Sequence, residues 1–102
     1  MINPALKVSL EGIADFCRRH SIRSLSLFGS ATREDFRSDS DIDVLVEFEE
    51  NAEASFFDLV EIERELSALF GNRTVDVVTP AVFRNPYRKR AILKDLERIY
   101  GP

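Results

Sequence analysis

The feature that most constrains this chain is a pair of strand-like apolar runs separated by one polar segment. The first run, residues 23–28, alternates apolar and polar side chains and ends at Gly29 and Ser30. After residues 31–40, Asp41 and Asp43 open a second, nearly continuous apolar run. Such runs indicate β-strands. The sequence therefore predicts two strands, with a glycine turn after the first and two acids at the start of the second.

The two acids should project from one face of the second strand. Because side chains alternate between faces, Asp41 and Asp43 point the same way while Ile42 faces the core. Their Cα atoms would lie about 6.6 Å apart, which is two strand steps. Like charges at that range raise the pKa of one carboxyl unless a cation neutralises them. Mg²⁺ prefers carboxylate oxygens and keeps positions open for phosphates, so both acids are candidate metal ligands.

Gly29 and Ser30 fit a phosphate-binding turn. Glycine lets the backbone approach a phosphate without a Cβ, and serine offers a hydroxyl and an amide at a possible helix N-terminus. If the two strands run antiparallel, the end of the first lies beside the start of the second. The turn and the acids would then share one end of the sheet.

A third acid stands in the next strand-like segment, residues 74–79. Asp76 interrupts its apolar residues, although aspartate is a poor strand former and is costly to bury unpaired. A metal ion beside it would supply a reason, so Asp76 is a further candidate site residue.

Two groups of basic residues have open roles. Arg33 and Arg37, in the polar loop, could bind triphosphate oxygens or could pair with the nearby acids Glu34, Asp35 or Asp39. A second cluster lies near the start of the last predicted helix, where the helix dipole disfavours cations. A partner protein, the triphosphate or neighbouring acids could compensate it; the cluster comprises Arg84, Arg88, Lys89 and Arg90.

Three helices are expected around the strands. The first begins at Asn3-Pro4 and ends near His20, with Cys17 as a core residue. The second begins at Ser55 and ends before Gly71, and the third extends from Asn85-Pro86 to about Ile99. The order helix, strand, loop, strand, helix, strand, helix predicts an α/β (α+β) two-layer domain with a small mixed sheet flanked by helices.

Composition narrows the classes of function. A chain of 102 residues with 44% hydrophobic content predicts one domain, residues 1–102. No apolar run is long enough to span a membrane and no signal-peptide pattern is present, so a cytoplasmic protein is expected. The single cysteine excludes an internal disulfide. Eighteen acidic against fourteen basic residues argue against a general nucleic-acid binder, although RNA stays open as an acceptor.

The order and spacing of Gly29-Ser30 and Asp41-x-Asp43 closely resemble the signature of the polymerase-beta-like nucleotidyltransferases. The segment SDSDIDVLVEF and the short chain are most similar to the minimal nucleotidyltransferases, the MNT antitoxin partners of HEPN-domain toxins. The resemblance covers almost the whole chain. It is more specific than a lone Asp-x-Asp, because residue type, spacing and flanking strands all agree.

This resemblance implies a polymerase-beta-like fold and a metal-dependent reaction. Asp41 and Asp43 would hold two Mg²⁺ ions, and Asp76 would complete the catalytic site as a third metal ligand or as a proton acceptor. Some minimal members lack a clear third acid. Gly29, Ser30 and Arg33 would bind the nucleotide.

The implied reaction transfers a nucleoside monophosphate from a nucleoside triphosphate to a hydroxyl and releases pyrophosphate. By resemblance the nucleotide is ATP, and the acceptor is a tyrosine of a cognate HEPN-domain toxin, which is thereby silenced. Larger members of the superfamily recognise their acceptor with an additional domain, whereas the catalytic core is expected to use all 102 residues of this sequence. A hetero-oligomer with a partner protein is therefore expected.

Two other functions stay open at this stage. The chain could be a non-catalytic antitoxin that neutralises its toxin by occlusion, in which case replacing Asp41 and Asp43 with Asn would leave neutralisation intact. It could also be the catalytic subunit of a two-component nucleotidyltransferase that modifies an antibiotic or another small molecule. The adjacent gene would then encode a helical substrate-binding subunit.

Overall fold

The computed structural model describes residues 2–53 and 56–102, and its centre is a four-stranded mixed sheet. The strand order across the sheet is β3-β2-β1-β4. The strands within the described residues are β1 (Ile22–Phe28), β2 (Ile42–Phe48), β3 (Val75–Val78) and β4 (Glu97–Tyr100).

The pairing of the strands brings the predicted turn and acids to one end of the sheet. β1 runs antiparallel to both β2 and β4, and β3 runs parallel to β2. Phe28, the last residue of β1, is the register partner of Asp43, near the start of β2. The antiparallel arrangement on which the sequence argument depended is therefore present, and Gly29 follows β1 at the point where β2 begins.

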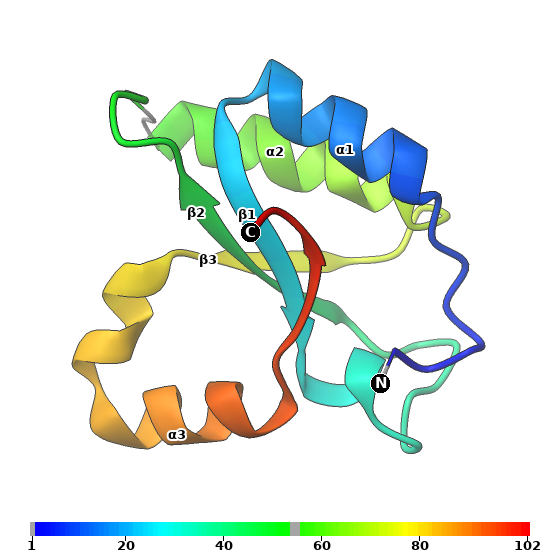
Figure 1. Ribbon diagram of the computed structural model, residues 1–102. Coiled ribbons are helices and arrows are strands. Elements are labelled where there is room, and N and C mark those ends of the chain that lie inside the picture. Colours follow the sequence, from blue (N-terminus) through cyan, green and yellow to red (C-terminus); the bar gives the residue numbers. More distant parts are fainter. Residues whose placement is uncertain (1, 54–55) are drawn as a thin grey trace.

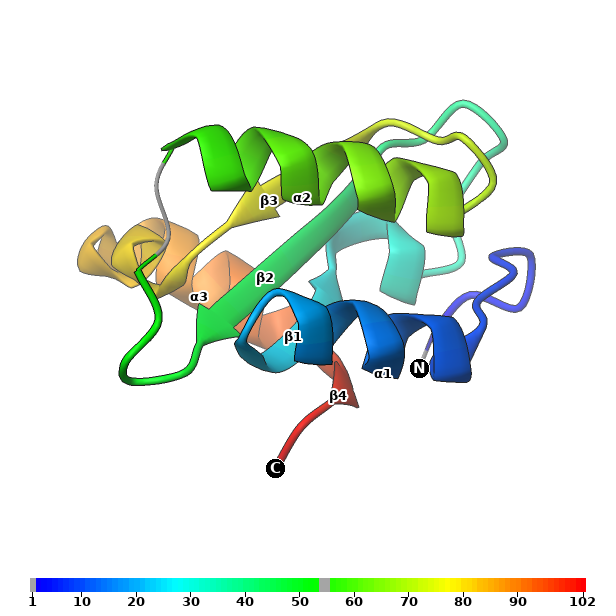
Figure 2. The same cartoon turned by 90° about the horizontal axis from the view of Figure 1, so that it is seen from above.

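Helices cover both faces of this sheet. The helices α1 (Leu10–Arg19) and α2 (Phe56–Leu69) pack on one face, and α3 (Pro86–Asp95) lies on the other (Figures 1 and 2). Two short 3₁₀ helices, η1 (Gly29–Thr32) and η2 (Pro80–Arg84), precede the loop to β2 and α3 respectively. The predicted class, a small mixed sheet flanked by helices, is confirmed.

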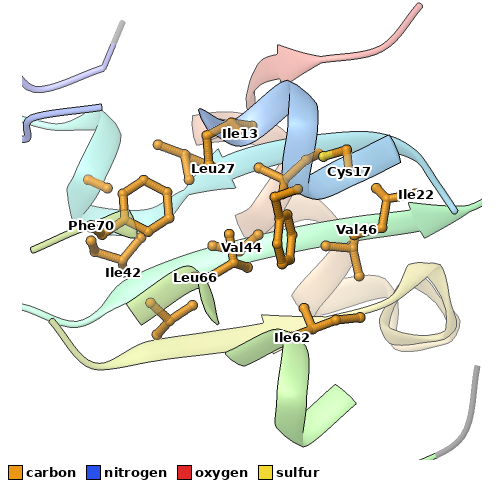
Figure 3. Close-up of a cluster of buried hydrophobic side chains, with 14 of the residues drawn as sticks. Ile13, Cys17, Ile22, Leu27, Ile42, Val44, Val46, Ile62, Leu66 and Phe70 are labelled. Atoms are coloured by element: carbon orange, nitrogen blue, oxygen red, sulfur yellow. The ribbon is translucent and has the colours of Figure 1, made fainter. Parts of the chain in front are cut away.

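The alternation of side chains along the strands divides the core into two clusters. Val44 and Val46 of β2 are fully buried in the larger cluster, between the sheet and the two helices α1 and α2 (Figure 3). The smaller cluster, on the α3 side, contains Phe28, Leu45 and Ile92. Residues of β2 with the parity of Leu45 therefore face α3.

Cys17 is a buried free cysteine in the larger cluster, as predicted. Burial raises the pKa of its thiol to about 12, so the side chain acts as a small apolar core residue.

The predicted start of the first helix is wrong. Helix α1 begins at Leu10, where the Ser9 side chain accepts a hydrogen bond of 3.1 Å from the Gly12 amide. Asn3 instead caps a turn, because its Oδ1 accepts from the Ala5 amide at 2.9 Å. Its Nδ2 donates to the Arg33 carbonyl at 2.7 Å, so Asn3 ties the N-terminal segment to the loop after η1.

The predicted end of the last helix is also wrong. Helix α3 ends at Asp95, and Leu96 has extended backbone angles of φ −65° and ψ 128°. Ile99, where the last helix was predicted to end, lies in β4, which pairs with β1. The reason is tertiary, because β1 offers backbone hydrogen-bonding groups that a further helical turn would leave unpaired.

Two further boundaries complete the comparison. The predicted helix start at Ser55 lies outside the described residues, whereas the helix end before Gly71 agrees with α2.

Among the described residues, none of the helices has both the length and the apolar character that crossing a bilayer requires.

The same leucine-to-alanine substitution should have different effects on stability in α2 and in α3. Leu66 of α2 is 0% exposed and Leu93 of α3 is 49% exposed. Leu66→Ala should lower the free energy of unfolding by about 2–5 kcal/mol through a cavity, and Leu93→Ala by no more than about 0.5 kcal/mol. Urea denaturation of both variants measures the difference, and equal losses would contradict the assignment of α2 to the main core.

Candidate active site

The three predicted acids gather at one end of the sheet, and Asp43 and Asp76 lie on the side that faces α3. Asp43 and Asp76 are register partners on the adjacent parallel strands β2 and β3, where neighbouring backbones lie about 4.8 Å apart. Asp41 stands one residue before β2 and is exposed, while Ile42 is fully buried on the opposite face. The structure therefore brings together Asp41 and Asp43, which their spacing indicated, and Asp76, which stood out as an aspartate within a strand.

The electrostatics of Asp43 reflect this arrangement. Burial raises the pKa of the Asp43 carboxyl, and the carboxylates of Asp76 and Asp41 raise it further. The guanidinium groups of Arg33 and Arg88 act in the opposite direction. Negative charge at this end of the sheet is thus only partly compensated by the protein itself.

The turn after β1 closes against the Asp43 carboxylate. Gly29 has a φ of +70°, and a Cβ at this position would collide with the Oδ2 atom of Asp43. Ser30 lies in the single 3₁₀ turn that follows, which Thr32 stabilises by donating from its hydroxyl to the Gly29 carbonyl at 3.0 Å. Glycine is needed here both for its backbone conformation and for the space beside Asp43.

Arg33 takes the alternative role that the sequence left open, pairing with a nearby acid. Its Nε is 2.9 Å from an Asp35 oxygen, and its Nη1 is 2.7 Å from Asp95 Oδ2 at the end of α3. Arg33 therefore joins the loop after η1 to α3. Its assignment to the nucleotide stays a prediction.

Arg73 is a residue of this region that the sequence analysis missed. Its Nη2 donates to the carbonyls of Arg37 and Ser40, at 2.5 and 2.9 Å, and its guanidinium lies 4.3 Å from the ring centre of Phe36. Its Nε is buried without a hydrogen-bond partner among the described residues. Arg73 thus holds the loop that carries Asp41, and no local pattern in the sequence indicates this long-range role.

The backbone fixes the same loop on the other side of Asp41. The Ile42 amide donates to the Thr74 carbonyl at 2.9 Å, directly before β2 and β3 pair. A cavity of about 310 Å³ lies beside this segment and is lined in part by Asp41, Arg73 and Thr74. The backbone next to Asp41 is therefore held by the Arg73 side chain at Ser40 and by the Thr74 carbonyl at Ile42, while Asp41 itself stays exposed.

The donor set suits a hard divalent cation. Among the described residues, no group of three or more histidine, cysteine or acidic side chains is already arranged around one metal-sized point. Asp43 nevertheless has a raised pKa, first because it is partly buried and then because the carboxylates of Asp76 and Asp41 lie close to it. An oxygen-bound cation held by these carboxylates would offset the repulsion between them. Asp41 is exposed and can rotate toward such an ion. The residues therefore fit a Mg²⁺-type site.

Comparisons with known proteins find similarity over most of the chain. The family model described as a nucleotidyltransferase domain matches residues 10–99. A Thermococcus cleftensis relative named protein adenylyltransferase MntA is 36% identical over 74 residues, which is 72% of each chain. A Methanocaldococcus jannaschii relative, provisionally named a protein adenylyltransferase, is 38% identical over 78 residues, covering 76% of this chain and 77% of the relative.

Solved structures show the same fold. One, provisionally described as a minimal nucleotidyltransferase, has a TM-score of 0.66 at 32% identity and covers 86% of both chains. A chain of a toxin-antitoxin structure with AMP-PNP has a TM-score of 0.71 at 18% identity, covering 93% of this chain and 75% of that one. At this identity the second match bears on the fold alone.

The contact between Gly29 and Asp43 predicts different outcomes for two glycine variants. Gly71 has a φ of +79° but nothing within 4 Å of an added Cβ. Gly71→Ala should therefore cost only the backbone strain, about 1–2 kcal/mol of unfolding free energy, and leave divalent-cation binding intact. Gly29→Ala should cost more and should also weaken cation binding, because Asp43 must move. Urea denaturation and magnesium titration of both variants test this, and matching titrations would contradict it.

The raised pKa of Asp43 predicts how stability depends on pH. Because the folded state holds this proton more tightly than the unfolded state, the metal-free protein loses stability as the pH rises from about 4 through the raised pKa. Asp43→Asn should therefore melt a few degrees higher than the wild type at pH 7 without metal, with the difference vanishing at low pH. Magnesium should stabilise the wild type more than the variant. Thermal melts at several pH values measure both effects, and a variant less stable at pH 7 would contradict the charge argument.

Proposed function

This chain belongs to the nucleotidyltransferase domain family, whose signature its Gly-Ser and Asp-x-Asp spacing resembles. From that premise we propose that the chain transfers AMP from ATP to a hydroxyl of a partner protein. The observation that carries the proposal is the side-by-side pairing of Asp43 and Asp76, with Asp41 next to them and the Gly29 turn in contact. Residues 1–102 would act as a single nucleotidyltransferase domain in the cytoplasm.

In this proposal the three acids and the glycine turn divide the work. Asp41 and Asp43 would hold divalent metal, and Asp76 would be the third ligand or would accept the proton of the attacking hydroxyl. Gly29 and Ser30 admit the triphosphate without a side-chain clash, because Gly29 has no Cβ and the Ser30 hydroxyl can donate to a phosphate oxygen. The half-buried position of Asp43 strengthens its interaction with a cation relative to a fully solvated carboxylate.

The chemistry is an in-line displacement at the α-phosphorus of the nucleotide. The oxygen of the acceptor hydroxyl forms a bond to the α-phosphorus, and the bond from that phosphorus to the oxygen bridging to the β-phosphate breaks. The electron pair leaves with pyrophosphate, and the hydroxyl proton passes to a base. When bound, two Mg²⁺ ions would stabilise the attacking and the leaving oxygen.

The acceptor we propose is a tyrosine hydroxyl of a HEPN-domain toxin, so that the chain acts as the antitoxin in a hetero-oligomer. Relatives over 72–76% of this chain bear the name protein adenylyltransferase, which supports a protein rather than a small-molecule acceptor. The net charge of −4 makes nucleic acid a poor alternative acceptor. The shared fold of the toxin-antitoxin chain is consistent with this assignment.

The proposal is tested by the masses of the intact proteins after incubation with ATP, magnesium and the product of the neighbouring gene. The wild type should add one or more AMP units to the partner, and Asp41→Asn or Asp43→Asn should lower the rate at least about 100-fold, because the metal ligands act directly on the reacting phosphate.

Asp15→Asn, a change at an exposed position on α1, is the control and should retain the wild-type rate. Unmodified partner that nevertheless co-purifies tightly, with neutralisation retained in Asp41→Asn, would favour occlusion over catalysis. Modification of a small molecule with no change in protein mass would overturn the acceptor.

A further inference from the structure

We propose that Arg88, on α3, binds the β- and γ-phosphates of the nucleoside triphosphate opposite the carboxylates. This inference rests on the proposed function and names a residue for it outside the Gly-Ser and Asp-x-Asp motifs. The evidence is the direction in which α3 presents this side chain, the absence of a competing partner and the charge balance of the site.

The inward face of α3 is marked by two contacts, one with the sheet and one with the loop after η1. Ile92 is 3% exposed and lies in the small cluster with Phe28 and Leu45. The side chain of Asp95 is 14% exposed and pairs with Arg33. Arg88 precedes Ile92 by four residues and Asp95 by seven, which is the spacing of one helical face. Arg88 therefore projects toward the sheet, one turn before Ile92.

The face that α3 covers is also the one that carries the acids. Asp43 shares its strand parity with Leu45, which contacts α3 through the small cluster. The guanidinium of Arg88 is near enough to Asp43 to favour the charged carboxylate. Arg88 and Asp43 therefore lie on the same side of the sheet, the side on which α3 packs (Figure 1 shows α3 on that side).

Arg88 differs from Arg33 because its side chain has no hydrogen-bond or ion-pair partner among the described residues. Arg33 already engages Asp35 and Asp95, whereas no hydrogen bond or ion pair involves the Arg88 guanidinium within residues 2–53 and 56–102. The first-turn amides of α3 are also occupied, because the Asn85 side chain accepts from the amides of Tyr87 and Arg88. Among the described residues, the Arg88 side chain is therefore an unengaged donor on the face of α3 that carries Ile92.

A triphosphate needs such a donor. Three carboxylates on one side of the nucleotide would repel its phosphate oxygens. A divalent metal held by these carboxylates would offset part of that charge. A guanidinium on the other side can form paired hydrogen bonds with phosphate oxygens and stabilise the charge that collects on the pyrophosphate as it leaves.

A neighbouring arginine gives a matched control. Arg90 projects about 200° around the helix from Arg88, so it faces away from the sheet while carrying the same charge on the same helix. Both residues are exposed, so either can be replaced without opening a core cavity.

The test is calorimetric binding of a non-hydrolysable ATP analogue and of AMP to the full chain with magnesium. Arg88→Ala should raise the Kd of the analogue about tenfold or more and change the Kd of AMP less than twofold, while Arg90→Ala should change neither. Arg88→Lys should recover part of the affinity, because the charge is kept but the paired hydrogen bonds are lost. Equal melting temperatures of the variants establish that all are folded.

The outcomes separate this inference from the proposed function. Wild-type affinity for the analogue in Arg88→Ala, or equal losses in Arg88→Ala and Arg90→Ala, would overturn the role of Arg88 and leave nucleotidyl transfer in place. An equal loss for AMP and the analogue would also overturn it, because the contact would not be to the β- and γ-phosphates. A wild type that binds no nucleotide would overturn both.

Discussion

The alternation of side chains along β2 is the constraint on which the rest of this structure depends. Ile42 and Val44 must face α1 and α2 to fill the main core, so Asp43 must face α3. A shift of one residue would bury the acid and expose the core, which makes the register of β2 strongly specified. The parallel pairing with β3 then sets Asp76 beside Asp43, and the antiparallel pairing with β1 sets Gly29 there.

This arrangement brings unfavourable electrostatic repulsion between carboxylates. Core burial fixes Asp43 at a position where the Asp41 and Asp76 carboxylates oppose its ionisation. Hydrophobic packing on the other face of the sheet is what makes this repulsion tolerable, because the same strand buries Val44 and Val46 completely. A site strained in the absence of ligand is typical of catalytic centres, where a bound cation or phosphate relieves the cost.

The arginines around the site have distinct tasks that their charge alone does not reveal. Arg33 joins the loop after η1 to the end of α3, and Arg73 holds the loop before β2 through two backbone carbonyls and the Phe36 ring. Both are committed to the framework that positions Asp41 and Gly29. Arg88 acts on Asp43 electrostatically and has no hydrogen bond or ion pair among the described residues, so its guanidinium is open to the role proposed for it.

The sequence by itself determined the parts of this protein that depend on short-range periodicity. Two strands, the glycine turn after the first, the acids at the start of the second and the exceptional position of Asp76 follow from side-chain alternation and from the cost of an acid among apolar residues. The tertiary structure decided what depends on partners distant in the chain. The β4 strand replaced the end of a helix because β1 had an open edge, and Arg33 and Arg73 found acceptors in segments that no local pattern links to them. Backbone pairing and ion pairing act between groups close in space, and only the folded chain sets which groups those are.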